Sequence, residues 1–381
     1  MRLLAIETSC DETAISIIEA TGGLTAPTFK VLSEVTVTQL DLHKAYGGVV
    51  PMLAKREHQI ALVPILLQAL EQAGLRHSHK TPHSHWEAIE ITLEREQELL
   101  LSMKEHLRDL PAPEIDAIAF TYGPGLEPAL WVGVNFAKAL AELWGKPLIP
   151  VNHMEGHLLS GLLEAPVTFP ILGLLVSGGH TELVLAKDWC EYEILGKTRD
   201  DAVGEAFDKV ARLLGLPYPG GPAISKLATE WTQETHGALA ITLPRPMIHS
   251  VDLDFSFSGL KTSVLYLVRS LLPLTENYKI AFAKEFQDAA VDVLVSKTKR
   301  AVKEHGPTTF VLGGGVSANK ELRRRMTVTF NGEFPQTKLI VPSFKMSTDN
   351  ATMIGIAGYI RFQKFGATAA SEIKATGNLS L

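Results

Sequence analysis

The chain has 381 residues, of which 46% are hydrophobic and 20% charged, the composition of an ordinary globular protein. Its two cysteines, Cys10 and Cys190, exclude a disulfide framework and suit a reducing compartment. The formal net charge of -6 argues against broad nucleic-acid binding, because phosphate contacts come from Lys and Arg. No signal peptide precedes the first expected strand, and no stretch reaches the roughly 20 apolar residues of a membrane span. We therefore expect a cytoplasmic protein without membrane contact.

Hydrophobic periodicity predicts that strands and helices alternate along both halves of the chain. Each half opens on β-rich sequence and continues with helices between strands, which predicts an α/β fold with two lobes and a ligand cleft between them. The expected strands cover residues 2–6, 13–19, 30–38, 115–120, 147–151, 171–176, 181–186, 309–312 and 339–341. The expected helices cover residues 53–73, 129–143, 158–163, 203–214, 223–232, 258–271, 278–305, 317–325 and 348–362.

The expected lobes divide the chain near its middle. The first lobe covers residues 1–150 and is completed by a C-terminal helix at 348–365. The second covers residues 151–347 and carries nucleotide and metal sites at the cleft, and residues 366–381 form a tail. We expect a helical arm inserted near 77–113, because a Glu-rich stretch places leucines seven residues apart, the pattern of an exposed amphipathic helix. The histidines in its first part are typical of a flexible loop, with a metal site as the alternative: His77, His79, His83 and His85.

Two histidines, His153 and His157, follow an expected buried strand and open a helix. Residues four apart lie on one helical face, so both imidazoles can reach a single ion. Asp349 stands where the last expected helix begins, and an acid there is ordinarily a cap or first-turn residue. The same carboxylate would complete a two-His-one-carboxylate set with open positions, which suits iron or zinc.

Three glycine-rich segments lie in the expected second lobe, each between expected strands or before an expected helix. Ser177-Gly178-Gly179-His180 can form an anion-binding turn or a plain hairpin. Residues 312–319, Leu-Gly-Gly-Gly-Val-Ser-Ala-Asn, follow a strand and open a helix, an arrangement that receives phosphate. Gly220-Gly221 leads into another helix. These glycines can close over a ribose or base, or serve only as turn residues. None of these matches the Walker loop or the Rossmann fingerprint.

Several charged residues have two interpretations each. Asp208 can accept from ribose hydroxyls or pair with Lys209 or Arg212. Asp11 and Glu12 can orient a nucleophile or are surface turn residues. Two basic clusters can bind RNA or are solvated helix faces: Lys320, Arg323, Arg324 and Arg325 in one, and Lys44, Lys55, Arg56 and His58 in the other.

The motifs taken together resemble the tRNA N6-adenosine threonylcarbamoyltransferase family in its bacterial form, from residue 1 to about 365 apart from the arm. The strings that carry the resemblance occur in order: Glu7-Thr-Ser-Cys-Asp-Glu-Thr13, Gly47-Gly-Val-Val-Pro51, Gly123-Pro-Gly-Leu126, His153-Met-Glu-Gly-His157, Val176-Ser-Gly-Gly-His-Thr181, Gly204-Glu-Ala-Phe-Asp-Lys209, Tyr218-Pro-Gly-Gly-Pro222, Gly313-Gly-Gly-Val-Ser-Ala-Asn319 and Thr348-Asp-Asn350.

The resemblance implies an actin-like (ASKHA) ATPase fold and the transfer of a threonylcarbamoyl group from threonylcarbamoyl-AMP to N6 of adenosine 37 in tRNAs reading ANN codons. It implies one divalent metal per subunit, Fe²⁺ or alternatively Zn²⁺, held by His153, His157 and Asp349. It also implies two protein partners, a catalytically inactive paralogue and a small ATPase. No general base is assigned, and Asp11 is the better of two weak candidates. The residues implied to bind the adenylate are Leu175, Val176, Ser177, Gly178, Gly179, Asp208, Gly221 and Asn319.

Three other functions compete with this one. A metalloprotease would use the histidine pair, although its helix requires Glu beside the first histidine, and here Glu155 occupies the middle position. A non-catalytic nucleotide-binding subunit would retain the glycine turns but needs no metal ligands. A kinase of the same fold would need a small phosphate acceptor and Mg-ATP.

Overall fold

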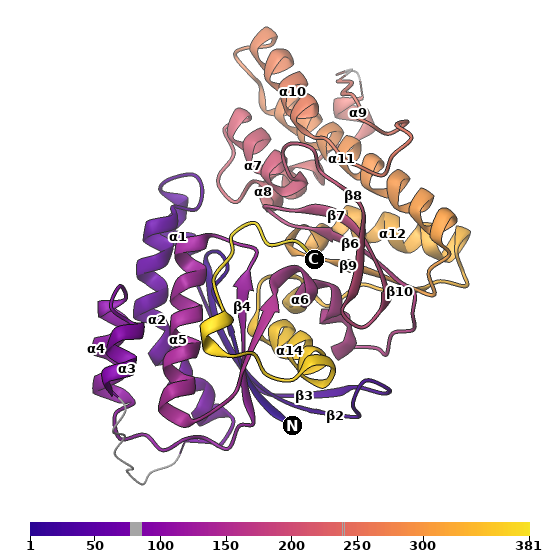
Figure 1. Cartoon of the computed structure of the whole chain (residues 1–381). Helices are drawn as coiled ribbons and strands as arrows, with labels where there is room; N and C mark the ends of the chain where they lie inside the picture. Colours follow the sequence, from indigo (N-terminus) through magenta and orange to yellow (C-terminus); the bar gives the residue numbers. More distant parts are fainter. Residues whose placement is uncertain (77–85, 238, 240) are drawn as a thin grey trace. The chain divides into compact units, whose positions relative to one another are not determined.

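The computed structural model describes residues 1–76, 86–237, 239 and 241–381 and divides the chain into two compact units (Figure 1). The first unit combines Met1–Pro166 with Asp349–Leu381, and the second is Val167–Thr348. None of the helices within the described ranges combines the length and apolar character that crossing a membrane requires. The histidines at 77–85, with their alternative metal site, lie outside the described residues.

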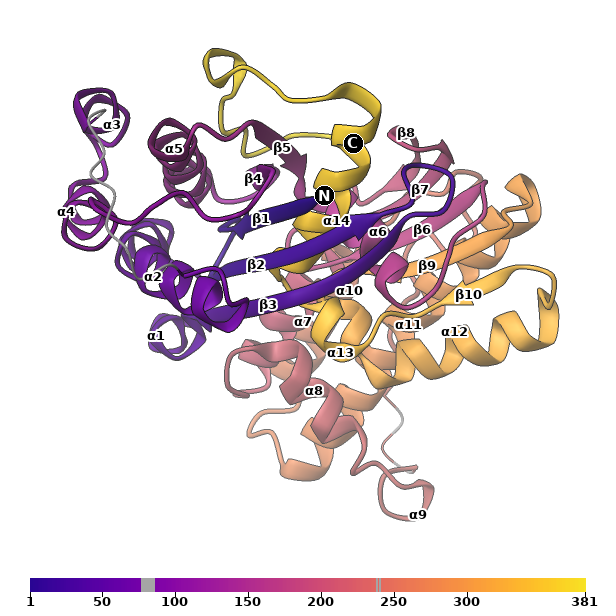
Figure 2. The ribbon, with the colours of Figure 1, turned by 90° about the horizontal axis from the view of Figure 1, so that it is seen from below.

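The first unit is built on a five-stranded sheet in the order β3-β2-β1-β4-β5, which Figure 2 shows from one side. The central strand β1 pairs antiparallel with β2 and parallel with β4; β2 pairs antiparallel with β3, and β4 parallel with β5. The strands are β1 (Arg2–Glu7), β2 (Glu12–Thr21), β3 (Thr28–Thr38), β4 (Ala117–Gly123) and β5 (Leu148–Asn152).

The second unit repeats this topology. Its sheet has the order β10-β9-β6-β7-β8, and its first strand, β6, is again central, antiparallel to the second strand and parallel to the fourth. Two units with one shared strand order confirm the predicted α/β, actin-like fold. The strands are β6 (Ile171–Val176), β7 (Thr181–Asp188), β8 (Glu191–Lys197), β9 (Thr309–Gly313) and β10 (Lys338–Ile340).

Alternating side chains of β1 bury both faces of the first sheet. Leu4 and Ile6 belong to a core with residues of α2 and α5, while the opposite face is covered by α14. Gly355 and Gly358 let α14 lie against the strands, because a Cβ atom at either would come within 2.8 Å of the Ile18 side chain or 2.6 Å of the Ala119 Cβ. The helices of this unit are α1 (Leu40–Lys44), α2 (Pro51–Gln72), α3 (Trp86–Thr92), α4 (Gln97–His106), α5 (Glu127–Trp144), α6 (His153–Leu159), η1 (Ser160–Leu163), α14 (Ala351–Phe365) and η3 (Ala370–Glu372).

The second unit packs its helices around a core of its own. Helix α8 lies against α7 and the long helix α11, and α12 also packs on α11. The helices are α7 (Val203–Leu213), α8 (Gly220–Ala228), α9 (Gln233–His236), α10 (Ser258–Ser270), α11 (Glu276–His305), η2 (Gly315–Ala318), α12 (Lys320–Glu333) and α13 (Phe344–Ser347).

The inserted arm forms two short helices, α3 and α4, and not the single exposed helix that the leucine spacing predicts. Leu93, Leu100 and Leu107 are all buried, because α3 packs on α5 and α4 on α2. Between the two helices the buried carboxylate of Glu96 lies 3.2 Å from the Lys55 ammonium and also accepts a hydrogen bond from the Asn135 amide. The apolar stripe thus joins the arm to the body of the first unit.

The first unit extends beyond the boundary expected at residue 150. Helix α6 packs on α14, which places residues 151–166 in the first unit. The expected tail also belongs to this unit, since the Thr376 N–H donates to the Tyr122 carbonyl oxygen and the Gly125 N–H to that of Gly377. A boundary placed at the end of a strand misses such contacts, because they depend on packing and not on local sequence.

His58, which the sequence places in a basic cluster, is fully buried. Its Nδ1 lies 2.7 Å from the Thr13 hydroxyl and 3.4 Å from the Gln39 amide nitrogen, and its Nε2 lies 3.0 Å from the Cys10 carbonyl oxygen. Nδ1 therefore accepts and Nε2 donates, the pattern of a neutral imidazole. Burial lowers the pKa of His58 from 6.5 to about 4, so this side chain contributes no charge to an RNA-binding face.

We expect His58 to remain neutral down to about pH 4 in the folded protein, measurable by NMR titration of ¹³C-labelled histidines. The unfolded chain takes up this proton near pH 6.5, so the stability that the neutral ring contributes is lost as pH falls from about 6.5 towards 4. The loss should reach about 3 kcal/mol for a shift of this size. Urea unfolding of His58→Gln should show a flatter pH dependence over that range. A folded-state pKa near 6.5 would contradict the burial argument.

Candidate functional site

The first candidate site lies where α6 follows β5. The side-chain oxygen of Asn152 caps α6 by accepting from the N–H groups of Met154 and Glu155, which fixes the start of the helix. His153 and His157 then fall on the same helical face. Both rings are at least nine-tenths buried, with 6% and 0% of their surface exposed.

Asp349 reaches this pair from the start of α14, whose cap is the next residue, Asn350. Helix α6 packs on α14 at Gly156, where a Cβ atom would lie 3.0 Å from the Ile354 side chain. The Oδ1 atom of Asp349 is 3.1 Å from His157 Nε2 and 3.4 Å from His153 Nε2. Within the described ranges the three ligand atoms lie within 4.8 Å of one another, so this group can hold a metal ion.

The chemistry of the three donors fits a divalent metal. Two imidazole nitrogens and one carboxylate oxygen are ligands of zinc and of non-haem iron, and three protein ligands leave coordination positions open. His157 Nδ1 is buried and without a hydrogen-bond partner in the described part of the chain. The polar surroundings of that ring therefore lie on the Nε2 side alone, towards Asp349.

Glu7 forms the layer behind the histidines, a role that the sequence did not reveal. Its Oε2 lies 3.0 Å from His153 Nδ1 and accepts from the Thr121 hydroxyl at 2.5 Å, while its Oε1 accepts from the Ser9 N–H. A carboxylate bonded to Nδ1–H directs the Nε2 lone pair of that histidine towards an ion. The sequence offered one sign of this role: Glu7 is a carboxylate at the end of a buried strand, where an unpaired charge is costly.

The pKa values of the residues in this cluster depend on burial and on one another's charges. Burial raises the pKa of Asp349, but the charge of His153 and hydrogen bonds from both histidines outweigh it and hold this pKa well below its usual range. Burial lowers the pKa of His153, but Glu7 and Asp349 outweigh it and raise this pKa well above 6.5. Burial lowers the pKa of His157. An ion must displace a proton from His153 Nε2, so metal binding should release protons and weaken as pH falls.

The acidic turn between β1 and β2 belongs to the same unit. Burial, together with the charges of Asp349 and Asp11, raises the pKa of Glu12 to about 9. Burial and the charges of Asp11 and Asp349 likewise raise the pKa of the Cys10 thiol. Cys10 is therefore a poor nucleophile near neutral pH. Asp11 remains the candidate base of this turn.

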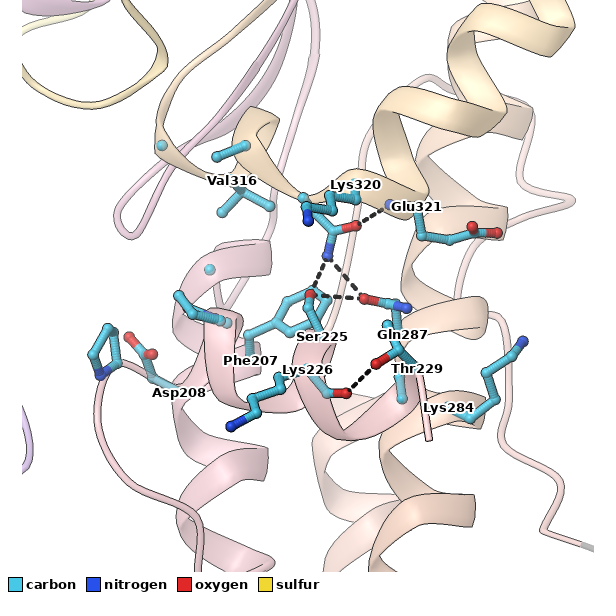
Figure 3. Close-up of a pocket in the computed structure, with 18 of the residues that line it drawn as sticks. Phe207, Asp208, Ser225, Lys226, Thr229, Lys284, Gln287, Val316, Lys320 and Glu321 are labelled. Atoms are coloured by element: carbon cyan, nitrogen blue, oxygen red, sulfur yellow. Dashed lines mark hydrogen bonds between the residues drawn. The ribbon is translucent and has the colours of Figure 1, made fainter. Parts of the chain in front are cut away.

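The second candidate site is a cavity of about 930 Å³ built entirely from residues of the second unit (Figure 3). Helices α7, α8 and α11 and the segment from η2 to α12 contribute its lining. This size lies within the range of small-molecule sites. Four of the eight expected adenylate-binding residues line the cavity: Gly178, Asp208, Gly221 and Asn319.

The other four expected residues are not part of the lining. Leu175 and Val176 are fully buried in β6. The Ser177 hydroxyl oxygen accepts from the N–H groups of Gly179 and His180 and closes the turn after β6. These residues support the turn that presents Gly178.

Asp208 also holds the start of α8. Its Oδ1 accepts from the Gly220 N–H at 2.6 Å, and a Cβ atom at Gly220 would lie 2.6 Å from the Asp208 Cα. Lys209, one expected partner of Asp208, instead pairs with Asp201 and Glu205 at 2.8 Å each. The sequence missed this because neighbours in a helix point to different sides.

The three arginines of the α12 basic cluster are hydrogen-bonded to neighbouring protein groups. Arg323 donates to the Ser317 carbonyl oxygen and the Ser347 hydroxyl, each at 2.6 Å. Arg324 and Arg325 both pair with Glu321, and their hydrogen bonds and charges lower the pKa of that carboxyl to about 2, although burial raises it. These contacts order the helix, and Arg324, whose side chain is 61% exposed, also lines the cavity.

Comparison with known proteins matches most of the chain, including both units, to a single family. The model of the tRNA N6-adenosine threonylcarbamoyltransferase family matches residues 30–80 and 96–356. Proteins with that name from Paraburkholderia xenovorans and Anaeromyxobacter dehalogenans are 42% and 43% identical, over 96% and 94% of this chain and 93% of each relative. The crystal structure of full-length HypF in the phosphate- and nucleotide-bound form has a TM-score of 0.51 at 12% identity, covering 97% of this chain and 56% of HypF, and supports the fold alone.

The fold and these matches define a transferase acting on tRNA. The chain belongs to the tRNA N6-adenosine threonylcarbamoyltransferase family, as the sequence motifs predict.

We expect Glu7→Gln to weaken metal binding roughly 10- to 100-fold, because the amide no longer accepts the His153 Nδ1 proton as a carboxylate does. Competition with a coloured chelator measures this affinity directly. Glu155→Gln is the matched control: Glu155 is equally buried and lies on α6, but it pairs with Arg361 at 3.1 Å. Equal metal affinity in wild type and Glu7→Gln would show that Glu7 does not support the ligand.

Proposed function

We propose that the protein transfers the threonylcarbamoyl group of threonylcarbamoyl-AMP to N6 of adenosine 37 in tRNAs reading ANN codons. Family membership supports the reaction class. The observation that carries the proposal is the convergence of His153, His157 and Asp349, with Glu7 behind them, in a chain that also has a nucleotide-sized cavity.

His153, His157 and Asp349 would hold one divalent metal, Fe²⁺ with Zn²⁺ as the alternative. A metal bound by such a set acts as a Lewis acid that draws charge from a carbonyl oxygen. Glu7 keeps the proton of His153 on Nδ1, so that Nε2 remains a ligand. The metal set and its support come from β1, α6 and the start of α14, all within the first unit.

The cavity of the second unit would bind the adenylate at a lining that includes Gly178, Asp208 and Gly221, with Asn319 as part of the same lining. In the reaction N6 of the tRNA adenosine forms a bond to the carbamoyl carbon, and the bond from that carbon to the phosphate oxygen of AMP breaks. The amine loses a proton, for which Asp11 is the candidate acceptor. AMP is a stable leaving group, so orientation of the two substrates supplies much of the rate.

The partners would be tRNA, an inactive paralogue and a small ATPase, in the cytoplasm. The protease alternative lacks its base: Glu155 is fully buried and pairs with Arg361, so it is not positioned to activate water. No contact in the described ranges favours the kinase or the scaffold.

Purified protein given tRNA, its partner proteins and labelled threonylcarbamoyl-AMP should label adenosine 37, located by nuclease digestion and mass spectrometry. His157→Ala removes one of three proposed ligands and should reduce labelling to background. His106→Ala, at an exposed site in the arm, is the matched control and should retain activity. Wild-type labelling no higher than that of His157→Ala would refute the catalytic role of this group.

A further inference from the structure

Three polar side chains form a closed hydrogen-bonded cluster at the cavity of the second unit. The Asn319 amide nitrogen donates to the Ser225 hydroxyl at 2.8 Å and to the Gln287 carbonyl oxygen Oε1 at 3.0 Å. The Ser225 hydroxyl in turn donates to the same Gln287 oxygen at 2.8 Å. All three residues line the cavity, and they come from α8, α11 and the start of α12. Figure 3 shows these bonds as dashed lines.

Helix α12 determines the direction of every bond in this cluster. The Asn319 oxygen Oδ1 accepts from the N–H groups of Glu321 and Leu322 at 3.0 Å each and so caps the helix. Asn319 must therefore turn its NH₂ group, which only donates, towards Ser225 and Gln287. The Gln287 atom that receives these bonds has to be the oxygen. The orientation of the Gln287 amide thus follows from the helix cap and not from a choice between two similar atoms.

The Gln287 amide nitrogen is left without an acceptor among the described residues at the wall of the cavity. Gln287 is only 5% exposed, and its Nε2 has no hydrogen-bond partner among the described residues. That nitrogen is not fully buried either, although it has no partner in the described part of the chain. In Figure 3 it lies at the end of the side chain away from Ser225. Gln287 lines the cavity and its two N–H donors have no protein acceptor among the described residues, so a ligand or water has to supply one.

We propose that Gln287 is a nucleobase-binding residue that donates to a ring nitrogen of adenine, and that Asn319 is the positioning residue that aims it. This rests on the proposed function, in which the cavity holds an adenylate. Adenine offers acceptors at N1, N3 and N7, whereas its exocyclic amine donates. Because the Gln287 oxygen already accepts two bonds, the side chain can donate but has no free acceptor to read the amine.

The neutral amide also favours the base over the phosphate. Phosphate groups are ordinarily held by cationic side chains and by N–H groups at helix starts. The lining supplies those elsewhere, at Lys226, Lys320 and the glycine turns. Asn319, expected from the sequence to bind the adenylate, has both ends of its amide occupied by protein groups. In this proposal it therefore shapes the adenylate site without contacting the adenylate.

The test measures binding of AMP and of its 1-deaza, 3-deaza and 7-deaza analogues to the full-length protein by calorimetry. With wild type, one analogue should bind roughly 10-fold more weakly than AMP, because it leaves the Gln287 donor unpaired. Gln287→Met keeps an unbranched side chain without donors. This variant should bind AMP roughly 10-fold more weakly and lose the distinction between AMP and that analogue.

Asn319→Asp separates positioning from folding. The aspartate still caps α12 but presents an oxygen to Gln287, which should turn the amide around. The deaza penalty should then vanish while thermal stability stays near that of wild type. Gln59→Met, at a buried glutamine of the first unit, is the matched control and should keep the full penalty.

Two results would overturn the inference alone: unchanged AMP binding by Gln287→Met, or a deaza penalty that persists in full in that variant. Wild-type protein that does not bind AMP would overturn the inference together with the nucleotide role of the cavity. The two failures are therefore distinguishable.

Discussion

The geometry of His153, His157 and Asp349 depends on the close contact of α14 with the central strands of the first sheet. That contact brings Asp349 to His153 and His157, which lie almost two hundred residues earlier in the chain. Gly355 and Gly358 make it possible, because any side chain at either would meet the sheet below 3.0 Å. A shift of the helix by the width of a methyl group would move the carboxylate away from both rings. The geometry of the ligands is therefore set by backbone packing well away from them.

Electrostatics adds a second constraint on the same cluster. Glu7 and Asp349 flank His153; the Glu7 carboxylate is fully buried and that of Asp349 is 19% exposed, so this pair requires compensating charge. The raised pKa of His153 favours a protonated ring that supplies this charge, and a divalent cation would replace its proton. The hydrogen bonds that Glu7 accepts from Thr121 and Ser9 hold this carboxylate in place in either state.

Both units use the repeated sheet topology in the same way. Glu7 ends β1 and His153 follows β5 in the first unit, while Gly178 follows β6 and Gly315 follows β9 in the second. In open α/β sheets, ligands bind beyond the carboxyl ends of the strands, where loops and helix starts converge. One topology therefore supports two different sites, a charged cluster of histidines and carboxylates in one unit and a cavity with a hydrogen-bonded amide cluster in the other.

The sequence by itself determined the alternation of strands and helices, the histidine pair and the glycine turns, because these depend on periodicity and on local turn chemistry. Tertiary structure decided the rest. Leu93 and Leu107 proved to be core residues just after the ends of α3 and α4, and His58 a buried neutral ring. Glu7 proved to be the group behind His153, and Gln287 the hydrogen-bond partner of Asn319 at the cavity. Local sequence does not specify which distant side chain a buried polar atom meets. The packing of one element on another does, because it alone determines which donors and acceptors are left to find each other.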